Sequence, residues 1–327
     1  MSFNEYLANN NVILADGGTM FEMESRGYNS AGRWIPECVL EEPEAVEQMH
    51  KEFADAGAEI IQCINFYAHQ QKAKQIGYDI DIHKLNNQAM RLARNGVQRS
   101  QQKFNRSIFL AGGLSPISFF IPQERSADII AETFKDQIRS QASEADVIFA
   151  ETFYTTEEAK LAIRAAKSQG VQVICTIHGD RSTIKEDMET LISEDPLGIG
   201  LNCYHGPKPM LEMMNEIHKR VRVPEHIHLA CQPVGYDVEE WEQYPGFPIA
   251  MEKVQITRME AAKFARNACD LGIKVIGGCC GFRPVHIRAM CTALGKQCRS
   301  QKFEPEMQYS RFPGVKQRVG DYWSRFE

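Results

Sequence analysis

The sequence of 327 residues predicts an α/β protein in which eight parallel strands form a (β/α)8 barrel. Eight short runs rich in β-branched apolar residues recur along the chain, and stretches with the spacing of amphipathic helices lie between them. The runs are continuously apolar, which is typical of parallel strands covered on both faces. Eight strands alternating with helices favour the closed barrel over an open doubly wound sheet, and no G-x-G-x-x-G motif follows the first run.

The candidate strands mark where functional residues are expected. In a barrel of this class the active site lies at the carboxyl ends of the strands, so the residues that end each run are the ones to examine. The runs begin at Val12 (VILADGG), Glu59 (EIIQCIN), Ser107 (SIFLAGG), Asp146 (DVIFAET), Val171 (VQVICTI), Gly198 (GIGLNCY), His226 (HIHLACQ) and Lys274 (KVIGGCC).

The stretches between the strands carry helix start and stop signals. In residues 43–57, Pro43 suits the first helical position and Gly57 can end the helix. Residues 155–170 repeat this pattern with a threonine N-cap, two glutamates in the first turn and a terminal glycine. Two more amphipathic helices are predicted at residues 126–141 and 257–272.

Composition excludes several classes of partner. The net charge of −6 and a pI near 5.9 provide no basic field for nucleic acid, and no apolar run approaches the ~20 residues needed to span a bilayer. The amino terminus lacks the basic and apolar regions of a signal peptide, so we expect a cytoplasmic protein. Its ten cysteines are then expected to bind metal or to be buried, since disulfides are rare in the reducing cytosol.

Three cysteines stand at the ends of two candidate strands. Cys203 follows the sixth run, and Cys279 and Cys280 stand side by side between glycines after the eighth. Zinc prefers four tetrahedral ligands, and a catalytic zinc keeps one position open for water or substrate. The three thiols therefore predict a zinc site, with burial as a small apolar side chain as the alternative for each of them.

The remaining thiols and two histidines fit structural roles better. Cys63, Cys175, Cys231 and Cys269 are expected to be buried apolar residues, and Cys38, Cys291 and Cys298 to be incidental. His178 and His205 follow strand ends, where a loop role is favoured over metal binding.

Six segments together resemble the homocysteine S-methyltransferase family, and within it the betaine-dependent branch. They occur in the same order as in the family: ADGG (15–18), ESRGYNSAGRWIPE (24–37), PEAVEQMHKEFADAGAE (43–59), NFYA (65–68), GLNC (200–203) and GGCCGFRPVHIRAM (277–290). A GGCC motif with an NC motif upstream is the specific part, whereas ADGG or PEAV alone is weak.

The resemblance implies a zinc-dependent transfer of a methyl group from an onium donor to homocysteine, which gives methionine. Cys203, Cys279 and Cys280 would hold Zn²⁺, and Tyr67 is an alternative fourth ligand when substrate is absent. Only the thiolate of homocysteine is a strong nucleophile, and binding to zinc deprotonates a thiol. No catalytic residue beyond the zinc and its ligands is implied.

The resemblance also assigns residues to homocysteine. Asp16 and Glu151 would bind its amino group, and the backbone of Gly17 and Gly18 would receive its carboxylate. The alternative is that Asp16 and Glu151 only cap the helices that follow them. Gln232 is a weaker candidate for the wall of the pocket.

Aromatic residues define the expected donor pocket, because a trimethylammonium group is held by ring faces at ~0.5–2 kcal/mol each. Trp34, Phe66 and Tyr67 match aromatic positions of the family. Thr152 stands where betaine enzymes of the family have a tyrosine that helps to hold the donor, and Tyr154 is a candidate to compensate. Betaine is the first expectation, and a sulfonium donor, either a dimethylsulfonio acid or S-methylmethionine, is the alternative.

The predicted domains are a homocysteine-binding barrel over residues 1–300 and a C-terminal tail over 301–327. The tail is shorter than the oligomerisation extension of the family, so we expect a homodimer or a monomer. Two other functions stay open at this point. A zinc hydrolase would be expected to use histidine and carboxylate ligands, and a non-catalytic zinc- or homocysteine-binding protein would need no donor pocket.

Overall fold

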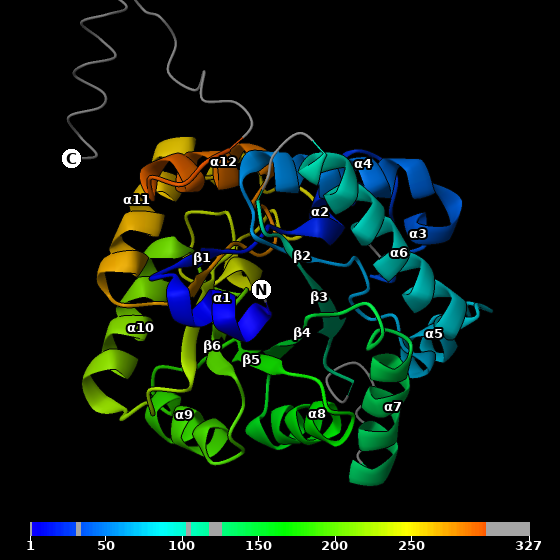
Figure 1. Cartoon of the computed structure of the whole chain (residues 1–327), viewed down its shortest axis with the longest axis horizontal. Coiled ribbons are helices and arrows are strands. Elements are labelled where there is room, and N and C mark those ends of the chain that lie inside the picture. Colours follow the sequence, from blue (N-terminus) through cyan, green and yellow to red (C-terminus); the bar gives the residue numbers. More distant parts are fainter. Residues whose placement is uncertain (1, 31–33, 103–105, 118–125, 299–327) are drawn as a thin grey trace, which may run out of the picture.

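The computed structural model describes residues 2–30, 34–102, 106–117 and 126–298, and it confirms the eight-stranded barrel (Figure 1). Every candidate run contains one strand. The strands are β1 (Ile13–Leu14), β2 (Ile60–Gln62), β3 (Phe109–Leu114), β4 (Val147–Phe153), β5 (Val173–Ile177), β6 (Gly198–Asn202), β7 (His228–Gln232) and β8 (Val275–Ile276).

The sheet closes into a ring. Its order runs β1-β8-β7-β6-β5-β4-β3-β2 with parallel pairing at each step, and a parallel bridge between Ala15 and Ile60 joins its two ends. Because all strands are parallel, their carboxyl ends lie at one end of the barrel, where the loops that follow them meet.

Helices surround the sheet, as the spacing predicts (Figure 1). α4 (Pro43–Ala56) begins at its proline and ends at Gly57, which has a φ of 115°. In α8 (Thr156–Ser168) the hydroxyl of Thr155 accepts the N–H of Glu158 and caps the helix. The other elements are α2 (Thr19–Ser25), α3 (Cys38–Glu41), α5 (Gln70–Gln75), α6 (Ile82–Gln101), α7 (Ala127–Arg139), α9 (Ile184–Ile192), α10 (Pro207–Arg220), η1 (Trp241–Gln243), η2 (Glu252–Val254), α11 (Arg258–Asp270) and α12 (Pro284–Ala293).

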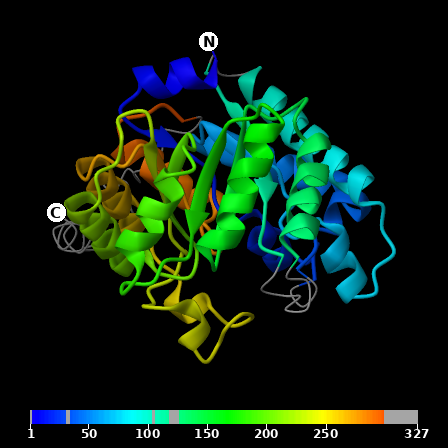
Figure 2. The same cartoon turned by 90° about the horizontal axis from the view of Figure 1, so that it is seen from below.

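The two ends of the barrel are covered differently. A helix that the sequence analysis did not predict, α1 (Phe3–Asn9), lies across the amino end of the strands, where Phe3 and Tyr6 pack on Phe109 with ring centroids 5.1 and 5.0 Å apart. The loop between β7 and α11, which contains η1 and η2, projects from the opposite end (Figure 2). The carboxyl end is therefore the end shaped by long loops.

Two apolar layers explain the continuously apolar strands. Side chains such as Ile60, Phe149 and Ile174 form a cluster inside the barrel together with Phe109. Alternating strand residues such as Ile148 pack outward against the helices in a second, larger cluster. Each strand is buried on both faces, which removes the alternation of polar and apolar residues.

Some predictions lie outside the described residues. The tail at 301–327 and the boundary at residue 300 are among them, so the expected monomer or dimer stays a prediction. Within the described ranges, no helix has both the length and the apolar character required to cross a membrane.

Candidate metal and substrate site

A cavity of about 220 Å³ opens at the carboxyl end of the barrel. Loops that follow several different strands contribute to its wall. The sequence-predicted residues that line it are Gly17, Gly18, Trp34, Phe66, Tyr67, Glu151, Thr152, Tyr154, Cys203, Gln232, Cys279 and Cys280. One predicted residue, Asp16, is buried behind this wall and does not line the cavity.

The three thiols meet at the cavity floor. Cys280 Sγ lies 3.9 Å from Cys203 Sγ and 3.8 Å from Cys279 Sγ, and all three sulfur atoms lie within 4.8 Å of one another. Zinc–thiolate bonds of about 2.3 Å in a tetrahedron place sulfur atoms about 3.8 Å apart. The described thiols therefore have the spacing of three ligands of one zinc ion.

The ionisation of the thiols points to a cation as well. Burial opposes ionisation of Cys203, but hydrogen bonds from Cys279 and Cys280 lower its pKa to about 5. The hydrogen bond to Cys203 raises the pKa of Cys279, and burial raises that of Cys280. The cluster alone thus supports one shared thiolate, since three adjacent negative charges repel. A divalent cation would allow all three to ionise.

Two buried carboxyl groups lie next to the thiols. Asp16 Oδ2 accepts the backbone N–H of Gln62 at 2.9 Å, and Glu151 Oε2 accepts the side-chain amide of Asn202 at 2.9 Å. Gln62 also donates its side-chain amide to the other oxygen of Glu151. Neither carboxyl group caps a helix, because α2 has no side-chain cap and Thr155 caps α8. The capping alternative for these two residues is wrong.

Burial makes both carboxyl groups weaker acids than usual. It raises the pKa of Asp16 well above its ordinary value, and burial together with the charge of Cys279 raises the pKa of Glu151 to about 8. A cationic partner would reverse both shifts by stabilising the charged forms. The pair is thus suited to bind an ammonium group.

The glycines after β1 let two loops touch. A Cβ atom on Gly18 would lie 2.6 Å from Cys279 O and from Cys280 Cα, and one on Gly17 would lie 2.3 Å from Phe282 O. The N–H of Gly18 donates to Phe282 O at 3.1 Å. The loop expected to hold substrate therefore lies directly on the loop that holds two thiols, which a larger side chain would prevent.

The upper wall of the cavity is aromatic. Phe66 and Tyr67 pack with centroids 4.2 Å apart, and Trp34 lies edge-on to Trp241 at 6.5 Å. Phe247 packs on Trp241 at 4.7 Å. Sequence reasoning missed Trp241 and Phe247, although four aromatic residues in the polar loop after β7 were a signal that could have found them. Other lining residues that it did not assign are Thr19, Met20, Gln62, Cys63, Glu242 and Gly278.

Backbone strain is concentrated at the same place. Among the described residues other than glycine, six have a positive φ, and four of these line the cavity: Trp34 (56°), Tyr67 (56°), Thr152 (63°) and Cys203 (59°). Such conformations are unfavourable for side-chain-bearing residues and persist at sites where the surroundings fix them. The clustering supports a functional role for this cavity.

The remaining candidates have structural roles. His205 contacts the carbonyl oxygens of Glu239 at 2.8 Å and Gly179 at 3.3 Å, and His178 contacts that of Phe153 at 3.2 Å. Neither histidine lines the cavity.

All ten cysteines are free. Cys63, Cys175 and Cys231 are buried as expected, whereas Cys269 is only half-buried. Cys38, Cys291 and Cys298, which the sequence analysis treated as incidental, are buried in the apolar core.

The chain matches a known family over most of its length. The family model described as homocysteine S-methyltransferase matches residues 13–294. The chain is 32% identical over 310 residues to betaine–homocysteine S-methyltransferase 1 of Bos taurus, covering 90% of this chain and 74% of the relative. It is 32% identical over 308 residues to S-methylmethionine–homocysteine S-methyltransferase of Pongo abelii, covering 90% and 81%.

A solved structure shares the fold. The metallated form of the homocysteine methyltransferase MmuM from Escherichia coli superimposes with a TM-score of 0.72 at 17% identity, covering 88% of this chain and 98% of that one. The match of the family model spans the whole barrel, from β1 to the end of α12. The chain therefore belongs to the homocysteine S-methyltransferase family.

Proposed function

We propose that this protein transfers a methyl group from a small onium compound to the sulfur of homocysteine with the help of zinc, and so produces methionine. The observation that carries the proposal is the meeting of three thiols, within 4.8 Å of one another, at the floor of a cavity with an aromatic wall.

Cys203, Cys279 and Cys280 would hold the metal. When bound, zinc would lower the pKa of the homocysteine thiol and supply the thiolate nucleophile at neutral pH. The thiols fit this role, because their spacing suits one ion and a cation would stabilise their ionised forms. Tyr67, which is buried and lines the cavity, is the proposed alternative ligand in the absence of substrate. A reducing compartment such as the cytoplasm would keep the thiols free.

Homocysteine would be oriented by the residues beside the thiols. The carboxyl groups of Glu151 and Asp16 would attract its ammonium group, with Glu151 at the cavity wall and Asp16 behind it. The backbone of Gly17 and Gly18 would face its carboxylate. Since the N–H of Gly18 already donates to Phe282 O, the contribution of Gly17 is the more direct one.

The donor would lie above the thiols against ring faces. Trp34, Phe66, Tyr67 and Tyr154 line this part of the cavity, and cation–π attraction with water exclusion would hold an onium methyl group near the sulfur. Betaine is the first candidate. A sulfonium donor is the second, because the resemblance to betaine enzymes leads us to expect a donor-binding tyrosine where this chain has Thr152. A relative of similar identity is also named for S-methylmethionine.

The decisive experiment is methionine formation by zinc-loaded protein with homocysteine and one donor at a time. Betaine, dimethylsulfonioacetate, dimethylsulfoniopropionate and S-methylmethionine are the donors to compare. Turnover with betaine alone would show that the pocket compensates for Thr152, and preference for a sulfonium compound would identify the second candidate. Binding of zinc and homocysteine without turnover of any donor would contradict the proposal in favour of a non-catalytic binding protein.

A further inference from the structure

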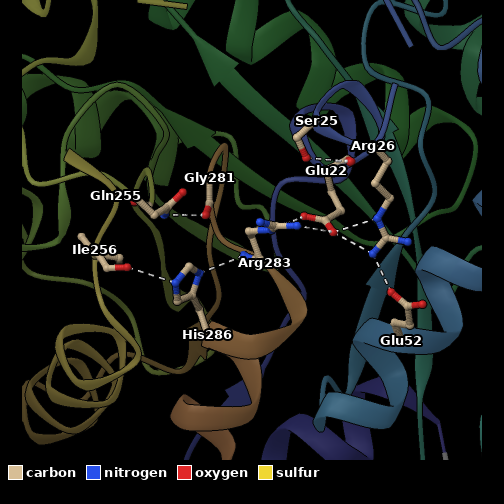
Figure 3. Close-up of polar contacts among 10 residues, drawn as sticks. Glu22, Ser25, Arg26, Glu52, Gln255, Ile256, Gly281, Arg283 and His286 are labelled. Atoms are coloured by element: carbon tan, nitrogen blue, oxygen red, sulfur yellow. Dashed lines mark hydrogen bonds and ion pairs between the residues drawn. The ribbon is translucent and has the colours of Figure 1, made fainter. Parts of the chain in front are cut away.

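A carboxylate outside the cavity is shared by two arginines. Glu22 on α2 is buried, with 2% of its side chain exposed, and it accepts Arg26 Nη2 at 2.6 Å and Arg283 Nε at 2.9 Å (Figure 3). Arg26 also pairs with Glu52 of α4 at 2.5 Å. A buried carboxylate without a cationic partner strongly destabilises the fold. Glu22 is therefore held in place by its ion pairs with the two arginines.

Arg283 ends the segment that carries two of the thiols. In this segment, Cys279 to Arg283, every carbonyl before the arginine accepts a hydrogen bond. Cys279 O accepts the N–H of Phe282 at 3.0 Å, Cys280 O that of Gly235 at 2.7 Å, Gly281 O the side-chain amide of Gln255 at 3.0 Å, and Phe282 O the N–H of Gly18 at 3.1 Å. The backbone of the segment is thus held by the loop after β1 and by the loop between β7 and α11, and by one hydrogen bond of its own.

The start of α12 is anchored to the same surroundings. The backbone N–H of Arg283 donates to His286 Nδ1 at 3.1 Å, so the other ring nitrogen carries the proton and donates to Ile256 O at 3.1 Å (Figure 3). Within this arrangement the ion pair of Arg283 with Glu22 is the side-chain link to α2. α2 begins at Thr19, directly after Gly17 and Gly18.

We infer that Glu22 and Arg283 are positioning residues that hold the metal-binding segment against the homocysteine loop, so that both zinc affinity and homocysteine binding depend on this ion pair. The pair touches neither the thiols nor the cavity, and it acts through the backbone of Phe282 and Gly18. Groups that orient metal ligands commonly change metal affinity by about 10- to 100-fold when they are removed. The homocysteine part of this inference rests on the proposed function, but the zinc part does not.

The test compares Glu22→Gln, Arg283→Gln and Glu52→Gln. Zinc affinity is measured by competition with a chromophoric chelator, and thermal unfolding is measured alongside. Glu52→Gln is the matched control, because it breaks an ion pair of the same network without touching the segment that holds the thiols. We expect Glu22→Gln and Arg283→Gln to weaken zinc binding by about 10-fold and Glu52→Gln to leave it within about twofold of the parent.

Steady-state kinetics provide a second measurement. The two positioning variants should raise the KM for homocysteine and leave the KM for the donor nearly unchanged, and Arg283→Lys should restore part of the zinc affinity. If Glu22→Gln and Arg283→Gln lower only the unfolding temperature and bind zinc as tightly as the parent, the inference is wrong. Since Arg283 is half-exposed, its variants should fold even where Glu22→Gln does not. Absence of turnover in the parent protein would contradict the proposed function. The zinc affinities measured by chelator competition would still test the inference about Glu22 and Arg283.

Discussion

At the scale of single residues, the site depends on a few side chains in unusual environments. Against the effect of burial, hydrogen bonds from Cys279 and Cys280 lower the pKa of Cys203, and burial together with Cys279 raises the pKa of Glu151 to about 8. Each group is costly to bury alone and becomes favourable with a cation next to it. Removing one of these side chains should therefore affect ligand binding more than folding.

The thiols can be tested one by one. Cys280→Ser should reduce bound zinc from about one equivalent per chain to a small fraction and abolish turnover, because zinc prefers thiolate over hydroxyl ligands. Cys231→Ser is the control, since this cysteine is buried in β7 and does not line the cavity. Metal analysis after dialysis would measure the difference. Equal zinc content in both variants would contradict the assignment.

Glu151 should determine whether the amino group of the substrate is recognised. The parent should favour homocysteine over 4-mercaptobutyrate, which has the same thiol and carboxylate but no ammonium group. Glu151→Gln should reduce this preference by about 10-fold or more, the value of a charged hydrogen bond of about 1.5–3 kcal/mol. The measurement is the ratio of kcat/KM for the two thiols. An unchanged ratio would place the ammonium group elsewhere.

At the scale of elements, the loop between β7 and α11 decides what lies above the thiols. Its η1 turn brings Trp241 next to Trp34, and Phe247 packs on the ring of Trp241. The loop is anchored at its base, because the N–H of Gly235 donates to Cys280 O and the N–H of Trp241 donates to Tyr204 O. Donor binding should therefore respond to this loop separately from homocysteine binding.

Trp241→Ala tests this separation. It removes a ring face from the cavity wall, so the KM for the donor should rise by about 5- to 30-fold, equivalent to the 1–2 kcal/mol of a desolvated cation–π contact. The KM for homocysteine and the bound zinc should stay near those of the parent. Tyr244→Ala in the same loop is the control, since Tyr244 does not line the cavity. Equal effects of the two variants would contradict the assignment.

At the scale of the whole molecule, buried histidines link stability to pH. Burial lowers the pKa of His50 to about 3 and that of His286 to about 4, below the 6.5 of an unfolded chain. The folded state therefore prefers the neutral form. This contribution to stability is complete above pH 6.5 and is lost as the pH falls toward 4, by up to about 2 kcal/mol per group between pH 6.5 and 5.

His50→Met isolates one of these groups. His50 lies where α4 packs on α6 next to Gly96, and neither of its ring nitrogens has a partner among the described residues. The variant should be at least as stable as the parent at pH 8, because an apolar side chain replaces an unpaired polar one. Urea unfolding at pH 8, 6 and 5 should show a smaller loss of stability than in the parent. Parallel losses would show that the pKa of His50 does not differ between the folded and unfolded states.

The sequence by itself determined the barrel, and it predicted many of the residues that line the cavity. Strands buried on both faces and helices with capping residues leave local patterns, and the GGCC motif puts two thiols at a strand end. Local pattern did not reveal α1, the roles of Asn202 and Gln62 as partners of Glu151, or the aromatic contribution of Trp241. Only the tertiary structure decided these, and it also decided the pairing of Glu22 with Arg283. The periodicity of the sequence predicts whether a residue is buried. It does not predict which residues that side chain contacts, because the closure of the barrel brings loops that are distant in sequence to one end.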